Sequence, residues 1–422
     1  MTEQPRPPGA DRSPEPLTFV EALFKAVDAV ARRLAHFAPL GRGLRNVMGA
    51  PGAELISWEH VREIAFATLE MQRETQGELR PSMVDRYQKM LVDSQEQVSG
   101  YTGLHVTGLP DRVEVFDQRD WIDANISSFK FLFDPISEKY VRMLADMEEQ
   151  QGVGSGRGAR RFARTLLSAQ VGIIMGYLSR NVLGQFDLSL PEPDKGGKLY
   201  VVEPNVMRIQ REIAADPDDF RMWITLHEVT HSFEFHCNGW LRPYIVSSMQ
   251  EYLNSIDWKG LARPDILRRM RGRAVGEGEA LKAGGLINII ATPEQRAILA
   301  RMQAVMSVLE GYSNHVMDRV GMSLLPTYHE MKSRFDRRRE SRSSAEKLFQ
   351  RLIGINLKMQ QYKMGQQFVD AVVEAEGIGF LNKVWERSDR MPTMDEICNP
   401  SAWIERTRAG TPPGRLRLVP NE

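Results

Sequence analysis

The sequence predicts a mainly helical α+β protein with a small strand element, and two patterns carry that prediction. Through most of the 422 residues, apolar side chains recur at the three- and four-residue spacing of helices. Residues 196–205 form the strongest candidate strand, because β-branched and aromatic residues lie between Gly-Gly and Pro-Asn. The sequence shows no internal repeat and no clear linker. We therefore expect one mainly helical domain at residues 17–408, between tails at 1–16 and 409–422.

Composition narrows the function classes. Basic and acidic residues are balanced at 55 each, which gives no support to a nucleic-acid or membrane-surface partner. No segment approaches the ~20 apolar residues of a membrane span, and the proline-rich N-terminus lacks an apolar signal core. The two cysteines, Cys237 and Cys398, fit a reducing compartment. We expect a cytoplasmic protein, and we make no prediction of its oligomeric state.

The elements follow one another along the chain with few interruptions. A short strand is expected at 113–116, and residues 196–205 are read either as a sheet edge along a substrate groove or as a plain hairpin arm. The glycine-rich residues 152–158 connect two helices, since no Gly-Lys-Ser/Thr follows as a phosphate loop requires. The apolar helix at 162–183 suits a central, buried position. Helices are predicted at 17–37, from 57, at 81–97, 118–150, 162–183, 217–239, 242–256, 292–320 and 345–376.

The helix at 217–239 contains the motif His227-Glu228-x-x-His231. Residues four apart on a helix lie one above the other, so His227 and His231 can offer both imidazoles to one metal ion. Glu228 lies beside them, where a carboxylate can remove a proton from an activated water. The alternative is a pair of hydrogen-bonded core histidines. The acidic residues at 218–219, the apolar spacing and Gly239 as an expected C-cap favour a real helix and a metal site.

A catalytic zinc takes three protein ligands and an open position, so the two histidines need a partner. The metzincin pattern requires glycine and histidine where this chain has Glu234 and Cys237, and that subclass is disfavoured. His236 falls on the opposite helix face and is expected to serve in packing. Glu234 shares the histidine face but lies about two turns from His227. We expect Glu234 to orient a histidine from outside the ligand set.

Glu310 is the preferred third ligand. It lies on a mostly apolar helical face, where a carboxylate is costly unless a cation pairs with it. Asn314 and Asp318 follow one and two turns later and are expected in the outer shell. The alternative for Glu310 is an exposed carboxylate on an amphipathic helix.

An oxyanion next to the metal needs a donor as well. Metallohydrolases often use an imidazole or a phenol for this purpose. His315 is the preferred candidate for a catalytic role, with Tyr312 and Tyr244 as further candidates.

A further set of segments carries a resemblance to known proteins: 182–188, 199–205, 226–231, 240–243, 309–311, 316–318, 361–362, 365, 368–369, 384–385, 392–393 and 402–403. Through these segments the sequence resembles an actinobacterial zinc-dependent metalloprotease family, some of whose members are described as coenzyme F420 biosynthesis-associated. The resemblance spans roughly residues 18–406 and implies a mainly helical fold with a small strand element and zinc hydrolysis by two histidines and one glutamate. The F420 description reports genomic association and does not identify a reaction. A third ligand so far downstream of His231 implies a helical insertion between them.

Together these features predict a zinc-dependent hydrolase that acts on a peptide or another amide. Zn²⁺ is inferred from the ligand types, and the same ligands accept other divalent ions. Two alternatives stay open. One is a non-catalytic metal protein with a fourth ligand such as Cys237 or Glu234, because structural zinc sites are closed. The other is a helical scaffold without metal.

Overall fold

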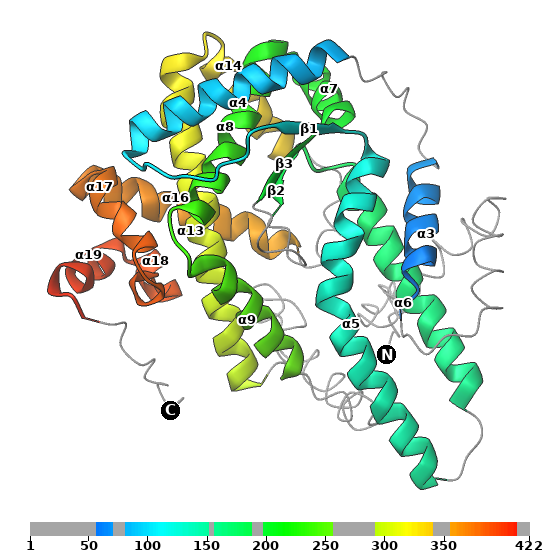
Figure 1. The fold of residues 1–422 in the computed structure, drawn as a ribbon. Coiled ribbons are helices and arrows are strands. Elements are labelled where there is room, and N and C mark those ends of the chain that lie inside the picture. Colours follow the sequence, from blue (N-terminus) through cyan, green and yellow to red (C-terminus); the bar gives the residue numbers. More distant parts are fainter. Residues whose placement is uncertain are drawn as a thin grey trace, which may run out of the picture.

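The structure is a computed structural model that describes residues 56–70, 81–151, 156–187, 197–255, 292–340 and 355–411. Within these residues the chain is mainly helical with one three-stranded sheet (Figure 1), which confirms the predicted fold class. The expected tail at 1–16, the helix at 17–37 and residues 152–155 lie outside the described part. None of the described helices is long and apolar enough to cross a membrane.

The helices largely follow the predicted order. Two described helices, α7 and α14, were not among those predicted, and residues 378–409 form several short helices. The helices are α3 (Trp58–Glu70), α4 (Pro81–Thr102), α5 (Gln118–Gln151), α6 (Gly156–Ser179), α7 (Glu203–Glu212), α8 (Pro217–His236), α9 (Leu241–Asn254), α13 (Pro293–Leu324), α14 (Tyr328–Glu340), α16 (Ile355–Glu376), α17 (Ile378–Leu381), η2 (Asn382–Trp385), η3 (Ser388–Arg390), α18 (Met394–Cys398) and α19 (Pro400–Ala409).

The sheet corrects one prediction. Its strands are β1 (Val113–Phe116), β2 (Gly184–Asp187) and β3 (Lys198–Val202). Their order is β1-β3-β2, with β1 parallel and β2 antiparallel to β3. Of the two interpretations of residues 196–205, the sheet edge is therefore wrong, because β3 is the central strand and β2 is an edge of the described sheet. The hairpin arm agrees with the antiparallel pairing of β3 with the preceding strand, β2. Strand β3 is also shorter than predicted. Residues 203–205 open α7, since proline suits the first turn of a helix.

Helix α8 begins and ends where its sequence directs. The Asp216 carboxylate accepts hydrogen bonds from the backbone N–H groups of Asp218 and Asp219, which caps the N-terminus. The helix ends at His236 with Cys237 as its C-cap, so the C-cap expected at Gly239 lies two residues too late. Most of its side chains are buried, because α4, α13, β2 and α7 all pack around it.

The core has a large and a small part. The larger cluster joins α4, α8, α13, α16 and the C-terminal turns, while the smaller one joins α3, α5 and α6 with Val202 of β3. Figure 1 shows α3, α5 and α6 together on one side of the sheet, away from α13 and α16. The expectation of a central position for α6 is wrong, since α6 belongs to the smaller cluster. Gly172 and Gly176 let it approach α3, because a Cβ on Gly172 would lie 2.8 Å from the Cβ of Ile64.

Candidate metal centre

The two histidines of the motif lie next to each other on α8. The ring centroids of His227 and His231 are 4.7 Å apart, and the two rings are nearly perpendicular. Their side chains are 20 % and 15 % exposed, respectively, so both rings are accessible from one side of an otherwise buried helix. This is the arrangement that the i, i+4 spacing predicts.

Glu310 reaches the same place from α13, which packs along α8. Its Oε2 lies 3.7 Å from Nε2 of His227. One ligand atom from each of His227, His231 and Glu310 falls within 4.8 Å of the others. Among the described residues, these three form a group of His, Cys, Asp or Glu side chains that could hold a metal ion. Helix α13 thus brings the third donor to the first two, although Glu310 lies far from them in the sequence.

The donor set fits a zinc ion. Zinc–ligand bonds of about 2.0–2.1 Å at tetrahedral angles separate two ligand atoms by about 3.3 Å. The 3.7 Å between His227 and Glu310 is close to that separation. Two imidazoles and one carboxylate are also the ligand types of a catalytic site that keeps one open position. Within the described residues no cysteine joins the cluster.

Behind His231, Glu234 holds the ring. Its Oε2 lies 2.7 Å from Nδ1 of His231, and Ser313 of α13 contacts both groups, at 3.0 Å from Nδ1 and 3.2 Å from Oε1 of Glu234. Since a carboxylate only accepts, Nδ1 of His231 carries the hydrogen, which leaves Nε2 as the ring nitrogen that can bind a metal ion. Burial lowers and the adjacent Glu234 charge raises the pKa of His231, and the net shift is upward. Burial raises the pKa of Glu234 more than His231 lowers it.

Glu228 is held by the edge strand. The backbone N–H of Phe186 in β2 donates to Oε2 of Glu228 at 2.9 Å. Gly184 leaves the space that the carboxylate fills, since a Cβ there would lie 2.6 Å from Cγ of Glu228. Burial raises the pKa of Glu228 to about 7, against the opposing charge of His231. Sequence reasoning missed this role of β2, although residues 182–188 were among the segments that carried the resemblance.

His315 does not occupy the position expected for an oxyanion donor. The ring is buried, with Nδ1 2.5 Å from Oδ1 of Asp370 and Nε2 2.7 Å from the hydroxyl of Tyr101. Both nitrogens are therefore engaged between α4, α13 and α16. Five residues after Glu310, a helical position points to a different face, and this is why His315 turns away from the cluster.

Asp318 and Tyr312 have hydrogen-bond partners outside the three-donor cluster, while the outer-shell role expected of Asn314 stays a prediction. Asp318 accepts a hydrogen bond from Gln366 at 3.0 Å and lies 3.7 Å from Lys332, so it belongs to a contact between α13, α14 and α16 rather than to an outer shell. Asn314 is half-buried one turn after Glu310. The hydroxyl of Tyr312 donates to Asn382 at 2.8 Å within the core.

The remaining side chains considered for the site each contact a group other than the three donors. Tyr244 packs edge-on against Trp240. The thiol of Cys237 donates to the backbone oxygen of Glu234, and burial raises its pKa to about 11. His236 packs edge-on against Phe186, as expected of a packing residue.

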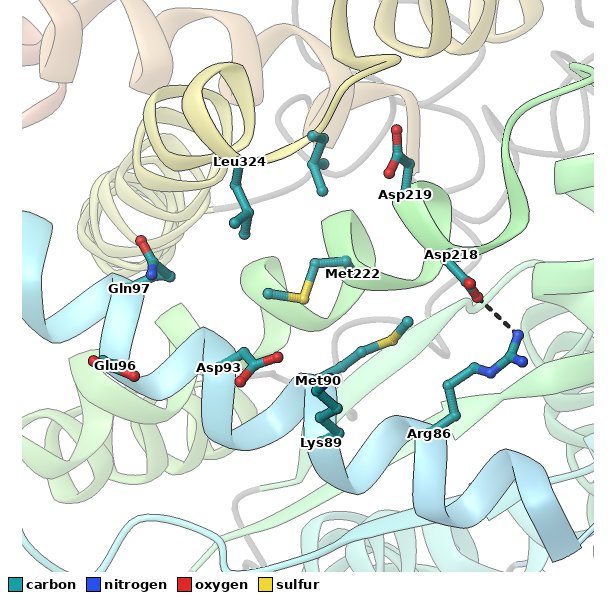
Figure 2. A pocket seen from close by; sticks show the side chains of 11 residues that line it. Arg86, Lys89, Met90, Asp93, Glu96, Gln97, Asp218, Asp219, Met222 and Leu324 are labelled. Atoms are coloured by element: carbon teal, nitrogen blue, oxygen red, sulfur yellow. Dashed lines mark hydrogen bonds and ion pairs between the residues drawn. The ribbon is translucent and has the colours of Figure 1, made fainter.

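A separate pocket of about 480 Å³ opens between α4, the N-terminal end of α8 and the C-terminal end of α13 (Figure 2). Met90, Met222 and Leu324 line it, and Arg86 forms an ion pair with Asp218 at 2.8 Å on its rim. None of its lining residues belongs to the three-donor cluster. The cluster, not this pocket, carries the candidate chemistry.

Comparison with known proteins agrees with this geometry. The zincin-like metallopeptidase family matches residues 56–404, which include the sheet, α8 and α13. A crystal structure from Chloroflexus aurantiacus, described as "a putative hydrolase with a novel fold", is 35 % identical and has a TM-score of 0.61, with 84 % of this chain and 99 % of that chain covered. No curated protein matches the sequence. On the extent of the family match, the chain belongs to the zincin-like metallopeptidase family.

Proposed function

We propose that this chain is a zinc-dependent hydrolase that cleaves peptide or other amide bonds. The observation that carries the proposal is the convergence of His227, His231 and Glu310 from two helices within 4.8 Å, with Glu228 adjacent in the motif. His227 Nε2, His231 Nε2 and a Glu310 oxygen would hold the ion. A bound zinc would supply a Lewis acid that polarises a carbonyl and lowers the pKa of a water to about 7.

The protein's own residues supply the proton transfers. Glu228 removes a proton from the attacking water and delivers it to the leaving amine. The hydrogen bond from Phe186 keeps one carboxylate oxygen of Glu228 on the sheet side and leaves the other for this exchange. Glu234 holds the hydrogen on Nδ1 of His231, so that Nε2 stays the donor atom.

The family membership and the hydrolase description of the Chloroflexus aurantiacus protein support an enzyme. Three donors, and no fourth among the described residues, support a catalytic site with an open position over a closed structural one. The narrower resemblance to the actinobacterial group stays a prediction from its sequence segments.

The test begins with metal content by mass spectrometry on protein purified without chelators. We expect about one zinc per chain in the wild type and little zinc in His227→Ala or Glu310→Ala. Retention of zinc in both variants would contradict the three-donor site.

The catalytic role of Glu228 is tested separately. Glu228→Gln should bind zinc like the wild type and lose turnover on peptides that the wild type cleaves. Because glutamine keeps the shape and the acceptor for Phe186 but cannot take up a proton, full activity in this variant would refute the mechanism.

A further inference from the structure

Helix α13 contributes two side chains to the candidate centre, Glu310 and Ser313, which lie about one turn apart. Ser313 is fully buried, and its hydroxyl lies between His231 and Glu234 of α8. The hydroxyl of Ser313 therefore links α13, which carries Glu310, to α8, which carries the two histidines.

A carboxylate cannot donate, so His231 and Ser313 are the donors in their hydrogen bonds with Glu234. His231 Nδ1–H donates to Oε2 of Glu234, and the hydroxyl of Ser313 donates to Oε1. The two oxygens of Glu234, a fully buried carboxylate, thus each receive a hydrogen bond, one from α8 and one from α13. Buried carboxylates are costly without such donors, so this arrangement favours one relative position of the two helices.

The opposite side of α13 is fixed by backbone contact. A Cβ on Gly311 would lie 2.4 Å from the carbonyl carbon of Gly365, and a Cβ on Gly365 would lie 1.9 Å from the backbone oxygen of Ser307. Helices α13 and α16 therefore meet at van der Waals distance immediately next to Glu310. With α16 behind it, α13 is held towards α8 at the position of Ser313.

We infer that Ser313 is a positioning residue that ties α13 to the His231–Glu234 pair and so fixes Glu310 relative to the two histidines. The inference rests on the proposed metal site and goes beyond it, because Ser313 does not itself bind the ion. Its role is to make the three donors converge before metal arrives.

The experiment measures zinc affinity of the purified full chain by competition with a chromogenic chelator. Ser313→Ala is expected to weaken zinc binding about 10- to 100-fold, the range seen when partners of metal-bound histidines are removed. Ser307→Ala is the matched control: Ser307 lies on the same helix, is equally buried, and its hydroxyl has no hydrogen-bond partner among the described residues. This control should bind zinc like the wild type.

A double-mutant cycle tests whether Ser313 acts through Glu234. If it does, Ser313→Ala should weaken binding much less in a Glu234→Gln background than in the wild type. Thermal unfolding of the metal-free proteins separates this role from simple packing. A lower unfolding temperature in Ser313→Ala with unchanged zinc affinity would overturn the inference. Wild-type affinity in Glu310→Ala would instead refute the metal site, and the inference with it.

Discussion

Replacing Gly184 with alanine is expected to impair the proposed general base while leaving the metal donors in position. The new Cβ would lie 2.6 Å from Cγ and 2.9 Å from Oε1 of Glu228. Ordinary carbon–carbon contacts are about 3.5–4.0 Å, so the Glu228 side chain must move by about 1 Å. That movement draws its carboxylate away from the backbone N–H of Phe186, which now holds it at 2.9 Å.

The expected loss of activity follows because proton transfer depends strictly on the position of the catalytic carboxylate. General acid–base catalysis contributes about 10²–10⁴-fold to rate, and a misplacement of about 1 Å can remove about 100-fold. We therefore expect Gly184→Ala to lower kcat/KM about 100-fold on a peptide selected from a fluorogenic library with the wild type. Zinc content should stay at the wild-type level, because the three atoms nearest the new Cβ all belong to Glu228 and none to a metal donor.

Gly100→Ala is the matched control, since nothing lies within 4 Å of a Cβ at that position of α4. It should keep wild-type turnover. Wild-type turnover in Gly184→Ala would refute the reasoning, because Glu228 would then tolerate a displaced position. Loss of zinc in Gly184→Ala would show instead that β2 supports the donors themselves.

Two further predictions concern stability. In the folded metal-free chain, burial raises the pKa of Glu228 to about 7, against about 4.5 for an unperturbed glutamate. Its contribution to the free energy of unfolding therefore falls as pH rises from 4.5 to 7, by at most about 3.4 kcal/mol at 1.36 kcal/mol per pH unit. Metal-free Glu228→Gln should therefore resist urea better than the wild type at pH 8 and equally at pH 4.5; an equal difference at both values would contradict this. His315→Ala should lower the free energy of unfolding by about 2 kcal/mol, because it removes two hydrogen bonds and buried volume, with zinc content unchanged. Loss of zinc in His315→Ala would contradict this prediction and show that His315 supports metal binding.

The sequence determined the local structure of this chain. Capping residues such as Asp216 and the apolar spacing of α8 depend only on neighbours along the chain, and this is why the main helices and β1 were predicted within a few residues. The i, i+4 spacing of His227 and His231 is local in the same sense. Their common face is a property of the helix itself, independent of what packs against it.

The tertiary structure decided everything that depends on packing between distant segments. Helix α13 brings Glu310 to the histidines, and β2 supplies the amide that holds Glu228. The same packing brings Ser313 to the His231–Glu234 pair and gives His315, which helical geometry turns to another face, its partners Tyr101 and Asp370. Helical periodicity alone does not show which face of α13 meets α8, because apolar residues lie on more than one face of that helix. Side-chain roles at such a crossing are set by the rotation and the distance of the two helices, and here the glycine contact with α16 and the buried Glu234 fix both.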